Sequence, residues 1–278
     1  MRDEQAIRRI VAALGDCSGR TVVEIGPGRG AITQQLALKA GRVVALEVDR
    51  SLAAQLTDEF SQTDLPDGSN IVIETVDVLA FDFEAASHSA GQRLIVVGNL
   101  PYYITSPILT KLADSAAVLD RAVLMVQREV ADRVTAHAGS SEYGLLSATV
   151  QAHGPVEPLF TLPPGAFSPP PQVHSTVFRW RFAPRFEELG VDRESFLAFL
   201  RRVFALKRKT LANNLRAAGM QSEAVAGALA RAGIDAKARA EALGLEKLAE
   251  LWRVLRTEGQ MEGVIPAGEM TPSDEYGS

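Results

Sequence analysis

Short, continuously hydrophobic runs alternate with helical stretches along the first two thirds of the chain. The runs that predict strands are 21–25, 42–48, 71–76, 94–98 and 122–127. The stretches whose apolar positions predict helices are 3–14, 30–40, 52–60, 107–118 and 128–137. Short strands without polar alternation, separated by helices, are typical of a parallel sheet covered on both faces. The pattern therefore predicts a doubly wound, Rossmann-like α/β domain.

The last third of the chain has a different pattern. A helical stretch (143–151) and two strand candidates (156–162 and 175–182) come first, and residues 163–171, with five prolines in nine positions, predict an extended loop between the strands. Apolar residues from 191 to 255 recur only at helical spacing. We expect an α/β domain over 1–184, a small all-helical domain over 185–256, and an acidic, disordered tail over 257–278.

Charge and composition exclude several classes of protein. The 278 residues carry 29 Lys and Arg against 34 Asp and Glu, and the last 22 residues hold five of those acids and no base. The single Cys17 excludes a disulfide framework and a cysteine-built metal site, and the four histidines have no ligand spacing. No signal segment or membrane-spanning run is present. These features predict a cytoplasmic protein with no metal and no membrane partner.

The first predicted strand runs into a glycine-rich turn. Gly26, Gly28 and Ala31 satisfy the G-x-G-x-x-G/A spacing of nucleotide-binding turns, and Glu47 ends the next strand near the position of a ribose-binding acid. This signal by itself fits a dinucleotide oxidoreductase, a methyltransferase with a nucleoside cofactor, or a glycine turn that only caps a helix.

Acidic residues favour the methyltransferase. Glu24, Glu47 and Asp77 fall at the ends of three successive strands, where doubly wound sheets bind their ligands. A carboxylate beside the turn opposes a pyrophosphate and suits a cation. The three acids fit a ligand with a ribose diol, an adenine amine and a cationic amino-acid tail, and S-adenosylmethionine is such a ligand. Each acid alone is equally explained as a helix N-cap.

The fourth strand ends in Asn99-Leu100-Pro101-Tyr102. The Asn99 side-chain oxygen and the Leu100 carbonyl, which the proline frees from helix bonding, can both accept from one amino group. The Tyr102 ring offers a face on which a base can stack. Two acceptors on an exocyclic amine favour a pyramidal nitrogen whose lone pair points at a methyl donor. The alternative is an Asn-Pro turn packed by tyrosines.

Taken in chain order, these segments resemble the KsgA-type (RsmA) ribosomal RNA adenine N6,N6-dimethyltransferases. The matching stretches are residues 24–30, 47, 77, 99–102, 126–130 and 167–175, and the resemblance covers about residues 3 to 250. Leu100 resembles this branch more than the erythromycin-resistance branch, which commonly has Ile there. The resemblance implies dimethylation of two adjacent adenosines in the 3′-terminal hairpin of 16S rRNA, late in small-subunit assembly. The implied partner is the immature small subunit, and we expect a monomer.

The resemblance also implies roles for individual residues. Those matching the cofactor site are Glu24, Gly26, Gly28, Glu47, Asp77, Val78 and Asn99, with Glu24 and Gly28 shaping the turn. Glu47 would take the ribose hydroxyls and Asp77 the adenine amine. Asn99, Leu100 and Tyr102 match the target-adenine site, and Phe167 matches a second aromatic that sandwiches the flipped base. Taken by itself, Phe167 is equally a core residue.

Basic residues are concentrated in the predicted helical domain. Residues 195–216 contain no acid, and with two further arginines they supply the candidate RNA contacts: Arg128, Arg133, Arg201, Arg202, Lys207, Arg208 and Lys209. The alternative for any one of them is a solvated helix face.

The sequence departs from the family pattern at its start. Members normally begin with a basic segment ending in a Gly-Gln-Asn-Phe-Leu-type motif, and Met1-Arg2-Asp3 stands where that motif should end. A truncated chain, a misassigned start codon and an absent lid are the three explanations. Besides the dimethyltransferase, the rival functions are a non-catalytic ribosome-assembly factor, a DNA adenine N6-methyltransferase and, more distantly, a nicotinamide oxidoreductase.

Overall fold

The computed structural model describes residues 1, 3–61 and 71–257, and these form two compact units. Unit 1 consists of Met1–Ala136 and Val150–Pro184, and unit 2 consists of His137–Thr149 and the residues from Arg185 onward. The sequence placed one boundary between residues 184 and 185, whereas unit 2 also takes in residues 137–149. The predicted disordered tail lies outside the described residues except for Thr257.

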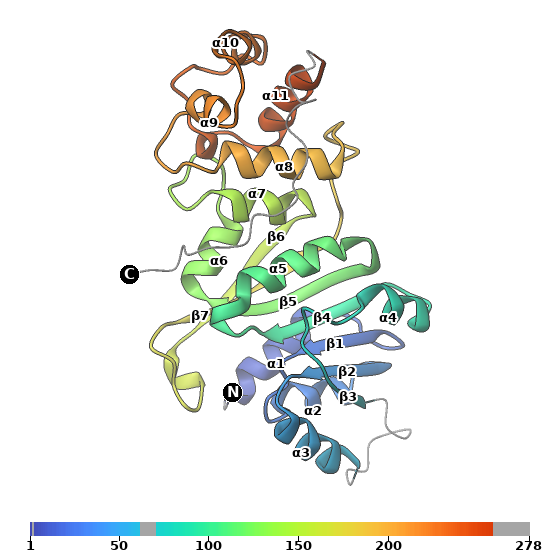
Figure 1. The fold of residues 1–278 in the computed structure, drawn as a ribbon. Helices are drawn as coiled ribbons and strands as arrows, with labels where there is room; N and C mark the ends of the chain where they lie inside the picture. Colours follow the sequence, from blue (N-terminus) through green and yellow to red (C-terminus); the bar gives the residue numbers. More distant parts are fainter. Residues whose placement is uncertain (2, 62–70, 258–278) are drawn as a thin grey trace. The chain divides into compact units, whose positions relative to one another are not determined.

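Unit 1 is built on one seven-stranded sheet with the order β3-β2-β1-β4-β5-β7-β6 (Figure 1). The strands are β1 Thr21–Ile25, β2 Arg42–Glu47, β3 Ile71–Thr75, β4 Leu94–Asn99, β5 Leu119–Gln127, β6 Val156–Leu162 and β7 Ser175–Arg181. Strands β1 to β5 are parallel, while β7 is antiparallel to both β5 and β6. The predicted doubly wound sheet is confirmed, with one reversed strand. No α-helix lies between β6 and β7, and the two strands pair directly in the antiparallel direction.

Within residues 3–61 and 71–152 the structure has seven α-helices: α1 Glu4–Ala13, α2 Ala31–Ala37, α3 Arg50–Ser61, α4 Phe83–Ala90, α5 Thr105–Asp114, α6 Arg128–Thr135 and α7 Leu145–Ala152. The sequence pattern missed α4, which has few large apolar residues. Its signals were its caps: Asp82 accepts from the Ala85 N–H, and Gly91 ends the helix in the left-handed conformation. The proline-rich segment is not extended throughout, because Pro164–Ala166 form a 3-10 turn.

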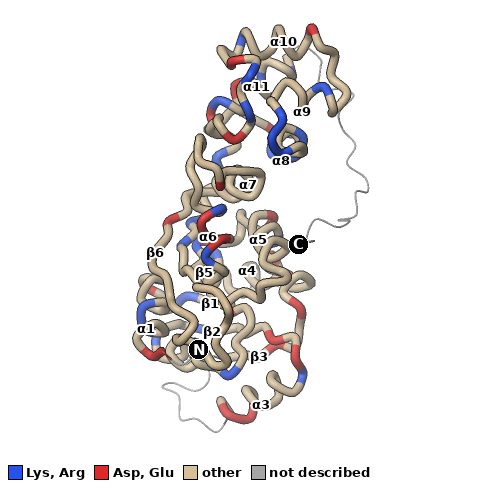
Figure 2. Tube along the Cα trace, turned by 90° about the vertical axis from the view of Figure 1, so that its left-hand side faces the viewer, with Lys and Arg blue, Asp and Glu red and all other residues tan. Residues whose placement is uncertain are grey.

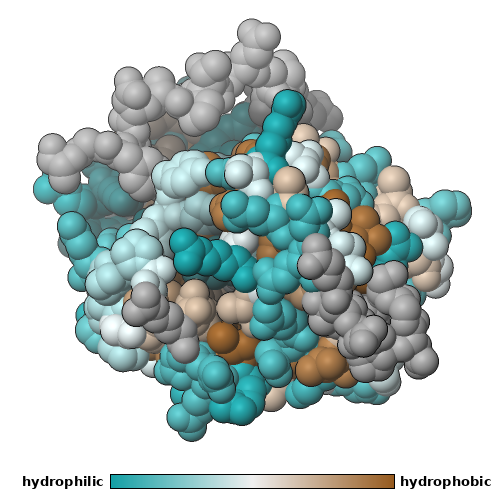
Figure 3. All heavy atoms as spheres, turned by 90° about the horizontal axis from the view of Figure 1, so that it is seen from below, coloured by the Kyte–Doolittle hydropathy of each residue, from teal (hydrophilic) through white to brown (hydrophobic). Residues whose placement is uncertain are grey.

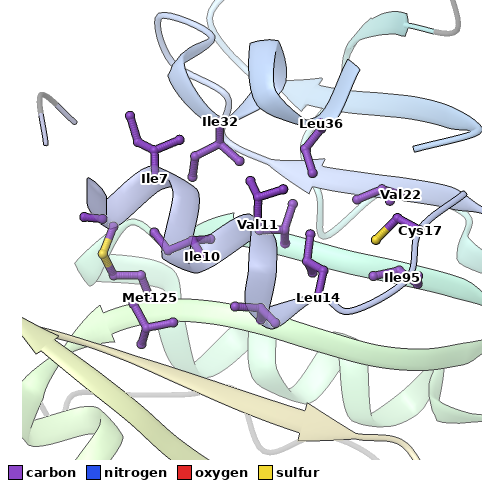
Figure 4. Close-up of a cluster of buried hydrophobic side chains, with 14 of the residues drawn as sticks. Ile7, Ile10, Val11, Leu14, Cys17, Val22, Ile32, Leu36, Ile95 and Met125 are labelled. Atoms are coloured by element: carbon purple, nitrogen blue, oxygen red, sulfur yellow. The ribbon is translucent and has the colours of Figure 1, made fainter. Parts of the chain in front are cut away.

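Helices α1 and α2 cover one face of the sheet, and α4 and α5 lie on the other (Figure 1). Figure 4 shows Ile7, Ile10 and Val11 of α1 against α2 and the strands. The same cluster includes Met125 of β5, and Phe167 packs against it from the proline-rich segment. Burial of these side chains fixes the strand ends that carry the candidate site.

Unit 2 is mainly helical, with α8 Arg193–Val203, α9 Leu211–Ala217, α10 Ser222–Arg231 and α11 Leu245–Thr257. Asp192 and Thr210 cap α8 and α9 with side-chain oxygens. In its core, Phe196 of α8 packs edge-to-face against Trp252 of α11, with the ring centroids 6.3 Å apart. The predicted all-helical C-terminal region is confirmed.

The surface carries few large apolar side chains. On the face seen in Figure 3 they appear as small separate patches among hydrophilic residues. Within the part of the chain that the structure describes, no helix has the length and hydropathy to cross a bilayer.

Candidate active site

The glycine-rich turn lies at the carboxyl end of β1, where the sheet order reverses between β1 and β4. Gly26 and Gly28 have φ angles of 65° and 58°, which L side chains rarely adopt. The Gly26 N–H donates to the Leu46 carbonyl of β2 at 3.0 Å, and a Cβ on Gly28 would meet only open space. The turn is therefore fixed at one end and leaves its backbone accessible to a ligand.

Glu47 supports this turn from β2. It is buried, and its two carboxylate oxygens accept from the Gly28 N–H at 3.2 Å and the Asp49 N–H at 3.0 Å. Each carboxylate oxygen has a second lone pair, so Glu47 can still accept from two hydroxyls. The structure thus gives Glu47 a positioning task that the sequence pattern did not reveal.

Glu24 does not project into open space. Its side chain is 1% exposed and accepts from the Thr33 hydroxyl of α2 at 2.6 Å. Burial raises the pKa of Glu24 to about 7, and the Thr33 hydrogen bond and the Glu47 charge act on it more weakly, in opposite directions. Its observed contact therefore anchors the start of α2 beneath the turn.

The raised pKa of Glu24 predicts a pH-dependent stability. The folded state holds the proton up to about pH 7 and the unfolded chain only to about 4.5. This group's contribution is therefore full below pH 4.5 and is lost as pH rises through 7. We expect Glu24→Gln to raise the free energy of unfolding at pH 8 by as much as about 3 kcal/mol and to change little at pH 4.5.

Denaturant titrations of the parent and of Glu24→Gln between about pH 4.5 and pH 8 measure the difference in their free energies of unfolding. Glu84→Gln, at an exposed position of α4, is the matched control and should show no such trend. A difference between Glu24→Gln and the parent that stays constant with pH would contradict the prediction.

Asp77 and two exposed apolar residues follow the neighbouring strands. Asp77 is exposed, and one of its carboxylate oxygens accepts from the Leu79 N–H at 2.9 Å. Val78, the next predicted residue, is buried, so only its backbone is available to a ligand. Val48, directly after Glu47, is 65% exposed, and Leu79 is 37% exposed. Sequence reasoning missed both as candidate faces for a base; the signal was an apolar residue directly or closely after each acid.

The acceptor element after β4 has two free oxygens. Leu100 is buried and its N–H donates to the Met125 carbonyl at 2.9 Å. Among residues 1, 3–61 and 71–257, neither the Asn99 side chain nor the Leu100 carbonyl has a hydrogen-bond partner. Tyr102 is 40% exposed, and its hydroxyl lies 3.3 Å from the Ser175 hydroxyl. Two acceptors and an aromatic ring therefore stand at one strand end.

Three motifs that are far apart in sequence meet at this end of the sheet. The Tyr102–Ser175 contact joins the acceptor element to the end of the segment 167–175, and the Arg128 N–H donates to the His174 carbonyl at 3.0 Å. Phe167 is half-buried against the α1 cluster, so part of its ring serves the core. Its second role, as a partner for the base, stays a prediction.

The candidate RNA contacts divide between the two units. Arg128 is exposed and Arg133 is half-buried in unit 1, whereas Arg201, Lys207, Arg208 and Lys209 are exposed in unit 2. Figure 2 shows the Lys and Arg positions in blue along the backbone, with a blue stretch at α8. Arg202 is half-buried, burial lowers its pKa, and one of its terminal nitrogens has no partner among the described residues.

The loop that carries Lys207, Arg208 and Lys209 is bonded to the buried side chain of Asn214 in α9. Asn214 is 3% exposed; its side-chain oxygen accepts from the Leu206 N–H at 2.8 Å, and its amide donates to the Leu206 and Thr210 carbonyls. Arg208 adopts a φ of 66°. The Asn214 bonds therefore hold the backbone on both sides of residues 207–209.

Comparisons with known proteins agree with this geometry. The sequence profile of the family described as "Ribosomal RNA adenine dimethylase" matches residues 1–256. The chain belongs to this family. A protein named "Ribosomal RNA small subunit methyltransferase A" from Acidobacterium capsulatum is 56% identical over 252 residues, covering 91% of this chain and 87% of that protein. Its counterpart from Koribacter versatilis is 48% identical over 267 residues, covering 92% of each chain.

Two solved structures share this fold. A dimethyladenosine transferase from Plasmodium falciparum superposes with a TM-score of 0.77 at 21% identity, over 93% of this chain and 98% of that one. The 23S rRNA methyltransferase ErmE superposes with a TM-score of 0.70 at 23% identity, over 92% and 99%. The family resemblance and the fold inferred from the sequence are therefore both confirmed.

Proposed function

We propose that this protein dimethylates the N6 amines of two adjacent adenosines in the 3′-terminal hairpin of 16S rRNA, with S-adenosylmethionine as methyl donor. The observation that carries the proposal is the pair of unpartnered oxygens, on the Asn99 side chain and the Leu100 carbonyl, beside the exposed ring of Tyr102. The proposed substrate is the immature small ribosomal subunit in the cytoplasm, and the proposed active form is a monomer.

The residues fit such a methyl donor, which supplies an electrophilic methyl group on a sulfonium. The turn at Gly26 and Gly28 leaves its backbone accessible, and Glu47 has lone pairs for a ribose diol. Asp77 has a second carboxylate oxygen for the adenine amine. The exposed side chains of Val48 and Leu79 offer apolar faces for the adenine ring.

In the proposed reaction, Asn99 and Leu100 accept the two hydrogens of the target amine. The nitrogen lone pair, otherwise delocalised into the ring, is then directed at the methyl carbon. The N–C bond forms as the S–C bond breaks, and the positively charged product amine loses its proton to water. Tyr102 stacks on the flipped base, and its hydrogen bond with Ser175 limits the orientation of its ring.

The loop of unit 2 gives a testable prediction for RNA binding. We expect Lys207→Ala with Lys209→Ala to weaken binding to small subunits and to reduce the slope of log K against log salt by about 1.8, because each lost phosphate contact contributes about 0.9. Filter binding over a range of salt concentrations measures this slope. The matched control removes two lysines of unit 1, Lys39 and Lys111, and should leave the slope within error. Equal slopes for both double variants would show that the loop residues Lys207 and Lys209 do not contact RNA phosphates.

Methyl transfer tests the function itself. Labelled S-adenosylmethionine is incubated with the protein and undermethylated small subunits, and the nucleosides are separated after digestion. The expected product is N6,N6-dimethyladenosine at two adjacent positions of 16S rRNA. Large subunits and adenine-containing duplex DNA serve as substrate controls. Subunit binding without any methylated product would contradict the enzymatic function and favour a non-catalytic assembly factor. Methylated DNA would favour a DNA adenine methyltransferase.

A further inference from the structure

A cavity lies at the end of the sheet where the parallel strands begin, opposite the strand ends that carry the candidate active site. Its volume is about 570 Å³. Its lining residues lie at or next to the starts of β1 and β5 and the end of β7, strands that Figure 1 labels. Its charged lining residues are Arg20, Arg121, Arg179, Arg181, Asp16 and Asp120. β1 alone is five residues long; at about 3.3 Å per residue, this separates the cavity from the glycine turn by roughly 15–20 Å. A ligand here cannot touch the target base.

The arginines are arranged unfavourably for a site with no ligand. Arg121 of β5 and Arg181 of β7 are directly opposed in the antiparallel register, and Arg179 lies two residues from Arg181 on the same face of the sheet. Like charges at directly opposed positions destabilise a strand pair. The cavity therefore concentrates positive charge at the cost of stability.

Part of this charge is explained by the fold. Asp120 pairs with Arg20 at 2.9 Å and with Arg121 at 2.7 Å, and Arg179 pairs with Glu157 at 2.7 Å. Arg121 and Arg179 also donate to backbone carbonyls at the C-terminal end of α1, where cations are favourable.

Three donor groups remain unexplained. The Nε–H groups of Arg20 and Arg179 are buried without a hydrogen-bond partner among the described residues. Arg181 lines the same cavity and is exposed, and its side chain has no ion pair or hydrogen bond within residues 1, 3–61 and 71–257. The nearby Asp16 carboxylate is occupied by Ser18, accepting from its N–H at 3.0 Å and its hydroxyl at 2.7 Å. The exposed guanidinium of Arg181, without an acceptor among the described residues and beside three further arginines of the cavity lining, fits a ligand that supplies acceptor oxygens.

We propose that this cavity is a binding site for a phosphate group. A phosphate offers several acceptor oxygens, matches the planar fork of a guanidinium, and compensates the opposed charges of Arg121 and Arg181. The ligand we expect is a backbone phosphate of ribosomal RNA, at a second point of contact remote from the methylated bases. That source rests on the proposed function, whereas phosphate binding itself does not.

Arg181 is the position to change, because its side chain is exposed and makes no hydrogen bond or ion pair with the described residues. The test uses the full chain and the variants Arg181→Ala and Arg181→Lys, with Lys39→Ala as an exposed single-charge control. The first arm titrates inorganic phosphate and ribose 5-phosphate by calorimetry. The second arm measures small-subunit binding as a function of salt.

We expect Arg181→Ala to weaken subunit binding roughly tenfold and to reduce the salt slope by about 0.9, with Arg181→Lys between it and the parent. Affinity for S-adenosylmethionine should not change. Loss of phosphate and ribose 5-phosphate binding with unchanged subunit binding would retain the phosphate site but make its ligand a free phosphorylated metabolite. If Arg181→Ala matches the parent in both arms, the proposal is overturned. The first arm contains no RNA, so its result stands even if the chain proves not to methylate.

Discussion

Replacement of Asn99 by alanine is expected to lower kcat for methyl transfer by roughly 10²–10³-fold, the loss seen when one preorganised group that stabilises a transition state is removed. The Asn99 side chain is exposed and has no partner among the described residues, so its truncation leaves no cavity and breaks no contact in the fold. The free energy of unfolding should therefore stay within about 0.5 kcal/mol of the parent.

Single-turnover methyl transfer at saturating S-adenosylmethionine and subunits measures this effect. Asn99→Asp is the informative companion variant, because it keeps an acceptor oxygen at the same place and should lose less activity than Asn99→Ala. Calorimetry of both variants separates chemistry from cofactor binding. An alanine variant within threefold of the parent in single turnover would show that Asn99 does not prepare the amine for attack.

Replacement of Glu47 by alanine is expected to raise the Kd for S-adenosylmethionine by roughly a hundredfold or more. The proposed ribose contacts are two hydrogen bonds to a carboxylate, each of which contributes about 1.5–3 kcal/mol. The variant also removes the acceptor of the Gly28 and Asp49 N–H groups, which loosens the turn. At saturating cofactor kcat should change much less, because Glu47 is not among the residues at the target amine.

A comparison of two ligands separates the ribose contact from the support of the turn. The parent should bind S-adenosylhomocysteine more tightly than its 2′-deoxy analogue, and Glu47→Ala should bind the two almost equally. Glu47→Gln keeps one acceptor oxygen, so its preference for S-adenosylhomocysteine over the 2′-deoxy analogue should lie between that of the parent and that of Glu47→Ala. If Glu47→Ala lowers the affinity for both ligands by the same factor relative to the parent, Glu47 acts only by supporting the turn.

Local residue patterns were enough to predict most of the sheet. Continuous apolar runs identified β1 to β5, because strands covered on both faces have no polar alternation, and β6 and β7 were recognised as two further strand candidates. The helix α4 was missed because Phe83–Ala90 has few large apolar residues, and its caps were weaker signals than periodicity. The reversal of β7 depends on which strand it pairs with, and a strand candidate does not specify its partner.

The candidate site was partly accessible in the same way. Asn99, Glu47 and Asp77 stand at strand ends because parallel strands end at one edge of a sheet. The burial of Glu24 and the exposure of Val48 were not readable, because both depend on which neighbouring element covers the side chain.

By itself, the sequence determined the fold class, the family and the motifs at the strand ends, since these follow from local periodicity and from short runs of specific residues. Only the tertiary structure decided which distant groups meet: Tyr102 with Ser175, Glu24 with Thr33, and Arg181 opposite Arg121. Such pairings, and the pKa values and unsatisfied donors that result, depend on strand register and burial. Register and burial are properties of the packed chain as a whole, so no single segment encodes them.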